Sequence, residues 1–353
     1  MSNIPVLRLS INACFTRSEY CYNAHMPTKE PAQSAVINPK VRFVEISADH
    51  AEQRIDNYLM CQLHGVPKSL VYRIIRKGEV RVNKGRIKPE YRLKQGDRVR
   101  IPPVHQAEKK VPGKVPDSLL KQLESRILFE DKRILILNKP SGLAVHGGSG
   151  LSFGLIEVIR ELRPNDKSLE LVHRLDRDTS GCLIIAKKRS ALRRLHEQLR
   201  EGSMDKRYMT LLKGKWQGRS RWVDAPLLKN VVQSGERLVF VDKKGKEART
   251  QFIPYCVGDV ASLMSVKLDT GRTHQIRVHA QHLGFPIAGD DKYGDDEFNR
   301  QLKNKGLKRL FLHAFSLKFH LPDPETGEDI PISVEAPLDE ALVNVLHKLN
   351  LEL

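Results

Sequence analysis

The sequence predicts an α+β protein, in which a small basic domain precedes a larger domain built on a mixed, mostly antiparallel β-sheet. Residues 53–103 hold two helical patterns followed by short strand patterns, which together make a compact unit. Between residues 125 and 353 the strand patterns outnumber the helical ones, and tight hairpins join several of them, as antiparallel pairing allows. With 353 residues, 40% of them apolar, the chain can bury the core that such domains need.

Composition narrows the class of partner. The chain carries 60 Lys and Arg against 42 Asp and Glu, a net charge of +18, which indicates a polyanionic partner such as nucleic acid or an acidic membrane. No apolar run reaches the roughly 20 residues that span a bilayer, and Arg8 interrupts the apolar N-terminal segment. We therefore expect no membrane partner, no signal peptide and a cytoplasmic location. The 5 cysteines form neither a CxxC pair nor a Cys/His cluster, so we expect free thiols and no metal site.

The first part of the chain divides into a tail, a domain and a linker. Residues 1–41 mix Ser, Asn, Pro and charged residues without periodicity, so we expect a disordered N-terminal tail. The small domain over residues 53–103 follows. Residues 104–124 are rich in Pro, Gly and Lys and lack a periodic pattern, which predicts a linker. The patterns inside the small domain are helical at 54–63 and 68–77 and extended at 79–83 and 97–102.

Positive charge is concentrated in this small domain. Residues 53–103 hold 13 Lys and Arg against 4 Asp and Glu, which is half of the net charge of the chain. The second helix has an apolar stripe from Leu70 to Ile75 and a basic opposite face, which a phosphate backbone would bind and which would otherwise be an ordinary solvated surface. The segment resembles the S4-like RNA-binding domain. The candidate RNA-binding residues on this helix and the following hairpin are Arg73, Arg76, Lys77, Arg81 and Lys84.

The larger domain covers residues 125–353. It opens with a hairpin pattern at 127–140 that turns at 130–132. Ser190 and Thr273 are candidate N-caps of its first two helices. The further strand patterns lie at 169–173, 182–188, 207–214, 236–242, 248–256 and 262–269, and the helical patterns at 190–201, 273–284 and 338–349.

Several catalytic motifs are missing from the sequence. It contains no GxxxxGK[ST] loop, no GxSxG and no HExxH, so NTP hydrolysis, ester hydrolysis and zinc proteolysis lose their support. The glycines after His146 lack the Lys and the helix of a phosphate-binding loop. The remaining candidates are a carboxylate-bearing segment, a tyrosine-bearing strand and a helix rich in Arg and His.

The carboxylate segment reads HRLDRDTSG at residues 173–181 and precedes an apolar strand pattern. Residues 178–180 fit an ordinary polar turn with local side-chain hydrogen bonds. Asp176 lies between two arginines, so a nearby cation can hold it ionised in a partly dry pocket. An ionised, desolvated carboxylate suits attack on an anomeric carbon, whereas a surface salt bridge is the alternative interpretation.

Two other segments supply possible partners for this carboxylate. His274, Arg277 and Gln281 repeat along one face of the helical pattern at 273–284, so Arg277 can reach an Asp in the sheet. Packing or exposed polarity is the alternative for the histidines. Tyr208, on the strand pattern at 207–214, is either an aromatic at the edge of the core or a platform for a flat base.

Four segments in order resemble the motifs of the pseudouridine synthase family, whose members act on ribosomal and transfer RNA: LNKPSGLAVHGG, HRLDRDTSG, KRYMTLLKG and TGRTHQIRVHAQHLG. The resemblance runs from about Gln53 to the C-terminus. It implies that Asp176 attacks the ribose or otherwise assists cleavage of the C1′–N1 bond, and that Arg174 helps to displace the target base. It also implies that Tyr208 stacks on the uracil and aids removal of a proton, and that Arg277 pairs with Asp176. The family needs no metal and no organic cofactor.

The resemblance therefore implies an isomerase that converts specific uridines of 23S ribosomal RNA to pseudouridine, as a monomer without a small-molecule substrate. One carboxylate suffices for an isomerisation that consumes no water, whereas a glycoside hydrolase needs a second one to direct water. A non-catalytic RNA-binding factor in ribosome assembly is the alternative from a different class. The same chemistry at other ribosomal or transfer RNA sites is a third possibility.

Overall fold

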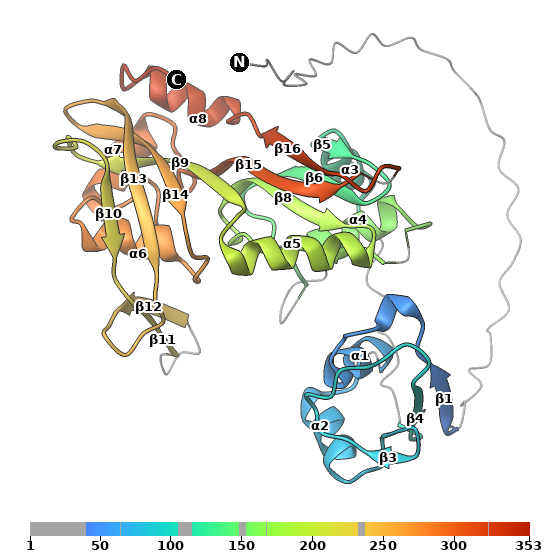
Figure 1. Cartoon of the computed structure of the whole chain (residues 1–353). Helices are drawn as coiled ribbons and strands as arrows, with labels where there is room; N and C mark the ends of the chain where they lie inside the picture. Colours follow the sequence, from blue (N-terminus) through green and yellow to red (C-terminus); the bar gives the residue numbers. More distant parts are fainter. Residues whose placement is uncertain are drawn as a thin grey trace, which may run out of the picture.

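The computed structural model describes residues 40–63, 65–104, 115–147, 153–166, 168–231, 237–323 and 325–353 (Figure 1). Nearly all of the tail expected over residues 1–41 lies outside these ranges, and so does the middle of the expected linker. The described chain forms a small N-terminal unit and a larger unit around a long sheet.

The small unit joins two helices to a four-stranded sheet in the order β1-β4-β2-β3. The apolar stripe of α2 is buried at Val71, Ile74 and Ile75, while the five candidate RNA-binding side chains are exposed. Sequence reasoning missed β1, which lies before residue 53 and pairs with β4. The elements are β1 (Arg42–Glu45), the 3-10 helix η1 (Ala48–His50), α1 (Ile55–Gln62), α2 (Lys68–Arg76), β2 (Arg81–Val82), β3 (Gly85–Arg86) and β4 (Arg98–Ile101).

The larger unit is built on a ten-stranded sheet in the order β10-β13-β14-β9-β15-β8-β6-β5, with β16 on β15 and β7 on β8. Every pair is antiparallel except β15 with β8, which confirms the predicted mixed, mostly antiparallel sheet and the α+β class. The strands are β5 (Ile127–Glu130), β6 (Ile134–Lys139), β7 (Glu170–Leu171), β8 (Ser180–Ala186), β9 (Asp205–Lys213), β10 (Arg221–Asp224), β13 (Arg249–Val257), β14 (Ala261–Leu268), β15 (Leu312–Pro322) and β16 (Asp329–Glu335). A separate pair is formed by β11 (Leu227–Val231) and β12 (Arg237–Val241).

Helices cover this sheet in more places than the sequence patterns predicted. Helix α3 lies within residues 104–124, which were expected to form an irregular linker. This part of the chain is instead a helix that packs on the larger unit, because its Leu123 is buried in the same core as the sheet. Neither α4 nor α7 was anticipated. The helices are α3 (Asp117–Glu124), α4 (Leu155–Leu162), α5 (Arg189–Glu201), α6 (Gln275–His282), α7 (Asp296–Asn304) and α8 (Glu340–His347).

The two predicted N-caps are wrong. Helix α5 begins one residue before Ser190 and has Lys188 at its N-cap position, without a side-chain hydrogen bond to the helix. Helix α6 begins after His274 rather than after Thr273, and His274 has the left-handed backbone conformation, with φ 54° and ψ 21°. The difference matters at α6, because it places a histidine at the first turn of the helix that borders the site.

The loop between β7 and β8 is the part of the fold that positions the carboxylate segment. It leads into β8, whose second residue, Gly181, pairs with Ala314 of β15 in a parallel arrangement. Gly181 has φ +107°, and a Cβ atom there would lie 2.3 Å from the carbonyl oxygen of Ala314. Only glycine fits this approach, so the residue fixes where the loop ends. None of the described helices combines the length and the apolar character that crossing a membrane would require.

Candidate active site

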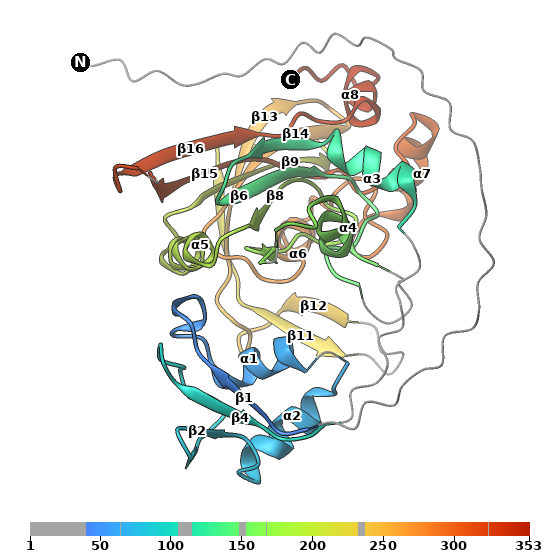
Figure 2. The same cartoon turned by 90° about the vertical axis from the view of Figure 1, so that its right-hand side faces the viewer.

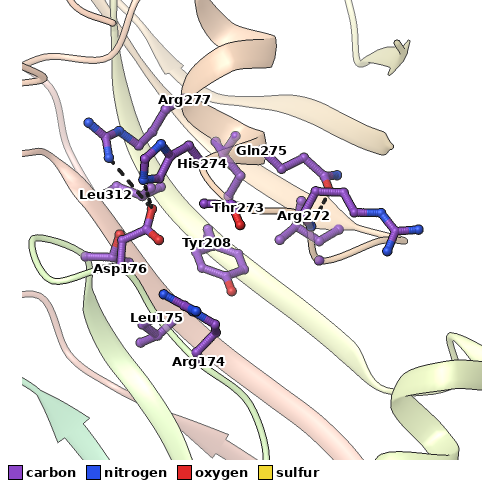
Figure 3. Close-up of a pocket in the computed structure, with 14 residues that line it drawn as sticks. Arg174, Leu175, Asp176, Tyr208, Arg272, Thr273, His274, Gln275, Arg277 and Leu312 are labelled. Carbon is purple, nitrogen blue, oxygen red and sulfur yellow. Dashed lines mark hydrogen bonds and ion pairs between the residues drawn. The ribbon is translucent and has the colours of Figure 1, made fainter. Parts of the chain in front are cut away.

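The carboxylate loop, β9 and the start of α6 enclose one pocket (Figure 3). Arg174 and Asp176 come from the loop, Tyr208 from β9, and Arg277 from α6. They come from three separate stretches of the sequence, and all four line this pocket. The structure thus brings together every catalytic candidate that the sequence indicated, together with Arg174.

Asp176 faces α6 rather than its neighbours in the sequence. Its Oδ2 lies 3.7 Å from Nη1 of Arg277 and 3.9 Å from Nε2 of His274, and 21% of its side chain is exposed. Arg177 instead pairs with Asp178, at 3.0 Å between Nε and Oδ1, and both of these side chains are exposed to solvent. The cation opposite Asp176 therefore comes from the helix, not from the adjacent arginines.

Arg277 forms a buried pair with a carboxylate that sequence reasoning missed. Its Nε and Nη2 donate to the two oxygens of Asp290, each at 2.7 Å. Burial opposes charge on Asp290, but the hydrogen bonds and charge of Arg277 and two backbone N–H groups outweigh it, so its pKa lies below the ordinary value. Burial also opposes the charge of Arg277, and Asp290 more than compensates, so the pKa of the guanidinium is raised. Asp290 thus fixes the guanidinium in the plane from which its third nitrogen faces Asp176.

His274 is held by a chain of hydrogen bonds. The backbone N–H of Val239 donates to the Tyr293 hydroxyl at 3.0 Å, and this hydroxyl lies 2.9 Å from Nδ1 of His274. Burial lowers the pKa of His274, against the opposing charge of Asp176, which favours the neutral ring. A neutral ring that accepts at Nδ1 carries its proton on Nε2, and we assign this tautomer from the network. The Nε2–H group then points to Asp176.

Tyr208 provides the flat wall of the pocket. Its ring is 9% exposed and lies between Arg174 and the start of α6 (Figure 3). Burial, followed by the charge of Asp176, raises the pKa of the phenol well above its ordinary value, so the hydroxyl stays protonated at neutral pH. Arg174 is exposed at the mouth of the pocket, next to this ring.

A buried lysine holds the carboxylate loop in place through hydrogen bonds. Lys139 is fully buried and donates from Nζ to the carbonyls of Pro140, Leu143 and Arg177 at 2.9, 2.7 and 2.8 Å. Burial lowers its pKa to about 7, and three carbonyl acceptors satisfy its three donors when it is protonated. Lys139 thereby ties the loop after β6 to the loop that carries Asp176.

The expectation of a purely local polar turn at residues 178–180 is wrong at Ser180. Its hydroxyl lies 2.8 Å from Nδ1 of His313 and accepts from Arg309 at 3.0 Å, and Ser180 and His313 are both buried. Nε2 of His313 contacts the carbonyl of Ala336 at 3.0 Å. His313 therefore connects the start of β8 to β15 and to the segment before α8. Among the described residues, no three His, Cys, Asp or Glu side chains gather in a way that would hold a metal ion.

Comparisons with known proteins point to one family. The model of the RNA pseudouridylate synthase family matches residues 133–282, and that of the S4 domain matches residues 53–99. Ribosomal large subunit pseudouridine synthase C of Pasteurella multocida is 58% identical over 312 residues, which cover 88% of this chain and 94% of that protein. The protein of the same name from Escherichia coli K12 is 59% identical over 314 residues, covering 88% of this chain and 97% of that protein.

A solved structure shows the same fold. Human RNA Pseudouridylate Synthase Domain Containing 4 superposes with a TM-score of 0.55 at 27% identity, over 67% of this chain and 97% of that one. Taken with the relatives at 58% and 59% identity, this shows that the chain belongs to the RNA pseudouridine synthase family.

Proposed function

We propose that this pseudouridine synthase acts on specific uridines of 23S ribosomal RNA and that Asp176 is the group that attacks or assists at the ribose. The observation that carries the proposal is the pocket in which Asp176 faces Arg277 and His274 beside the ring of Tyr208. The relatives named for the large ribosomal subunit support the choice of RNA.

The reaction is an isomerisation within one nucleoside. The C1′–N1 bond breaks, the uracil turns in the site and a C1′–C5 bond forms. The hydrogen of C5 leaves as a proton and N1 takes up a proton, so the composition of the nucleoside does not change. In the covalent route, an oxygen of Asp176 bonds to C1′ while N1 departs, and this ester is released when C5 attacks C1′. No water is consumed, so a second carboxylate to direct water is not required.

The surroundings of Asp176 suit a lone acid. Asp290 is the other carboxylate within reach of Arg277, and the bidentate pair with that residue engages both of its oxygens. Asp178 is engaged with Arg177 at the surface. Asp176 therefore remains the acid that is free to meet a substrate carbon in the pocket.

The remaining pocket residues suit a base taken out of its stack. Extrusion of a nucleotide costs a few kcal/mol. Stacking on an aromatic ring offsets about 1–3 kcal/mol of this cost, and Tyr208 presents such a ring. Arg174, exposed at the mouth, is positioned to replace the displaced base. Arg277, held by Asp290, keeps a positive charge opposite Asp176.

The small domain supplies the second contact with RNA in this proposal. The S4 model matches it, and its candidate residues form an exposed basic surface on α2 and the hairpin after it. Because those side chains lie outside the pocket, they would bind the backbone and not the target base. We further propose that the enzyme is a monomer that works in the cytoplasm. In this proposal, residues 53–103 bind RNA and residues 125–353 carry out catalysis.

The test is conversion of deproteinised 23S ribosomal RNA by the purified protein, together with pseudouridine mapping in a strain that lacks the gene. Loss of defined pseudouridines in the large-subunit RNA of the deletion strain, restored by the wild-type gene, is the expected result. Losses confined to transfer RNA or small-subunit RNA would move the target to other sites. Failure of the purified protein to convert any RNA would favour the non-catalytic assembly factor.

A further inference from the structure

A second groove leaves the candidate active site on the side of α7. It shares Arg174, Asp176, His274 and Arg277 with the pocket described above, so the two hollows are continuous. From there the groove runs along the segment 306–310 between α7 and β15 to Leu342 of α8. A polymer that delivers one nucleotide to Asp176 must continue on both sides of it, and this groove offers an exit.

Positive charge gathers beside the far end of the groove. We define the α7 lysine cluster as Lys303, Lys305, Lys308 and Lys348. Lys308 lines the groove, and Nζ of Lys348 donates to the carbonyl of Lys305 at 3.0 Å, which brings the end of α8 to the same place. A Cβ atom on Gly306 would lie 3.7 Å from Nζ of Lys348, so the groove wall is open backbone beside this ammonium group.

Within the described chain, no ion pair neutralises the charge of these lysines. Among the described residues, none of the four forms an ion pair, whereas Arg300 on the same helix pairs with Glu297. The segment 298–311 contains no Asp or Glu. Of the acids that line the groove, Asp176, Asp178 and Asp290 each face an arginine, and Asp291 is exposed near its rim. The field at the α7 end is therefore positive and not neutralised locally.

The cluster also lies away from the other basic surface. Figures 1 and 2 show α7 and α8 at the end of the molecule opposite to the small domain, in both views. Basic contacts at both ends, with the pocket between them, match a long polyanion that passes across the site. An isolated solvated face would not require the groove that joins it to the pocket.

We propose that the α7 lysine cluster binds the phosphate backbone of the RNA strand that flanks the target uridine, on the side away from the small domain. This inference rests on the proposed function and extends it to a binding track outside the pocket. The cluster contacts phosphates and not bases, so it contributes affinity and register without reading sequence.

The test compares two triple variants of the full chain for binding to deproteinised 23S ribosomal RNA over a series of salt concentrations. The variant K303A/K305A/K308A removes three contacts from the track. The control K121A/K132A/K318A removes three exposed lysines that lie on α3, the β5–β6 turn and β15, outside the groove. Loss of three phosphate contacts flattens the slope of log K against log salt by about 2, which weakens binding about 100-fold at 0.1 M salt. The control retains the slope of the wild type.

A photo-crosslinking amino acid at position 308, compared with one at position 318, gives an independent readout. Crosslinks from position 308 that map within a few nucleotides of the modified uridine are the expected result. An unchanged salt slope in K303A/K305A/K308A, or crosslinks no more frequent from position 308 than from position 318, would overturn the track. If the wild type makes pseudouridine but K303A/K305A/K308A keeps the salt slope of the wild type, only the proposed role of the lysine cluster is wrong. If the triple variant has a flatter slope but the wild type makes no pseudouridine, the proposed function is wrong, while the cluster still binds RNA.

Discussion

Replacement of Asp290 by asparagine tests whether Arg277 is fixed by this buried carboxylate. The two side chains are 0% and 9% exposed, and two hydrogen bonds of 2.7 Å join them. In Asp290→Asn the amide can still accept from the backbone N–H groups of Lys292 and Tyr293, but its NH2 group faces the Nε–H of Arg277. The guanidinium is then left buried with Asp176 as its remaining counter-charge.

The expected cost follows from that geometry. Removing one partner of a buried pair costs about 3–5 kcal/mol, and Asp176 at 3.7 Å offsets part of it, so we expect a loss near the lower end. For a domain of this size, about 3 kcal/mol lowers the melting temperature by roughly 6–12 °C. Arg277 also turns toward Asp176 and engages it, so single-turnover isomerisation slows more than RNA binding weakens.

The assays are thermal unfolding and release of tritium from RNA labelled at C5 of uridine, since the hydrogen of C5 leaves in the reaction. Asp291→Asn is the matched control, because Asp291 carries the same charge at an exposed adjacent position. The folded-state pKa of Asp290 is depressed, so the stability that the pair contributes is present above the ordinary Asp pKa and is lost as pH falls through the folded value. The stability of Asp290→Asn should therefore fall less than that of the wild type as the pH is lowered. Equal stability and equal rates for the two variants would refute the assigned role of Asp290.

Three further outcomes are expected. Joint replacement of Arg73, Arg76 and Lys77 on the basic face of α2 should weaken binding of 23S ribosomal RNA and flatten its salt dependence, because those charges release counterions. An unchanged salt slope would show that α2 does not contact the RNA. Tyr208→Phe should bind RNA like the wild type, whereas Tyr208→Ala should lose about 1–3 kcal/mol of stacking, and equal binding by both variants would contradict a stacking role. Ser180→Ala should destabilise the fold by about 1–3 kcal/mol, because it leaves the buried Nδ1 of His313 without its donor, and a melting curve like that of the wild type would argue against this bond.

Local patterns predicted those parts of the fold that depend on local order. The hairpin from Ile127 to Lys139 and the two faces of α2 follow from alternation and helical spacing, and the structure has both. Helix α3 was missed because its apolar positions are few and follow a segment rich in Pro, Gly and Lys. The N-terminus of α6 was misplaced because the left-handed conformation of His274 depends on contacts with Tyr293, which no local pattern encodes.

The same division holds for the site. Asp176, Tyr208 and Arg277 were named from their motifs, and the pocket contains all three. Asp290 was not identified from the sequence, because the residues GDD at 289–291 do not reveal which of the two acids turns inward. The bond from Ser180 to His313 joins positions 133 residues apart, so it emerges only when β8 and β15 pair. Partners that are set by tertiary packing are thus the ones that the sequence leaves undetermined.

Isomerisation of deproteinised 23S ribosomal RNA by Asp176→Asn, measured as tritium release in a single turnover, tests most directly whether the Asp176 carboxylate acts at the ribose. The substitution keeps the size and shape of the side chain and removes its charge. We expect the variant to bind the RNA with the affinity of the wild type and to convert no uridine. Conversion by Asp176→Asn at the rate of the wild type would contradict the claim that this carboxylate acts at the ribose.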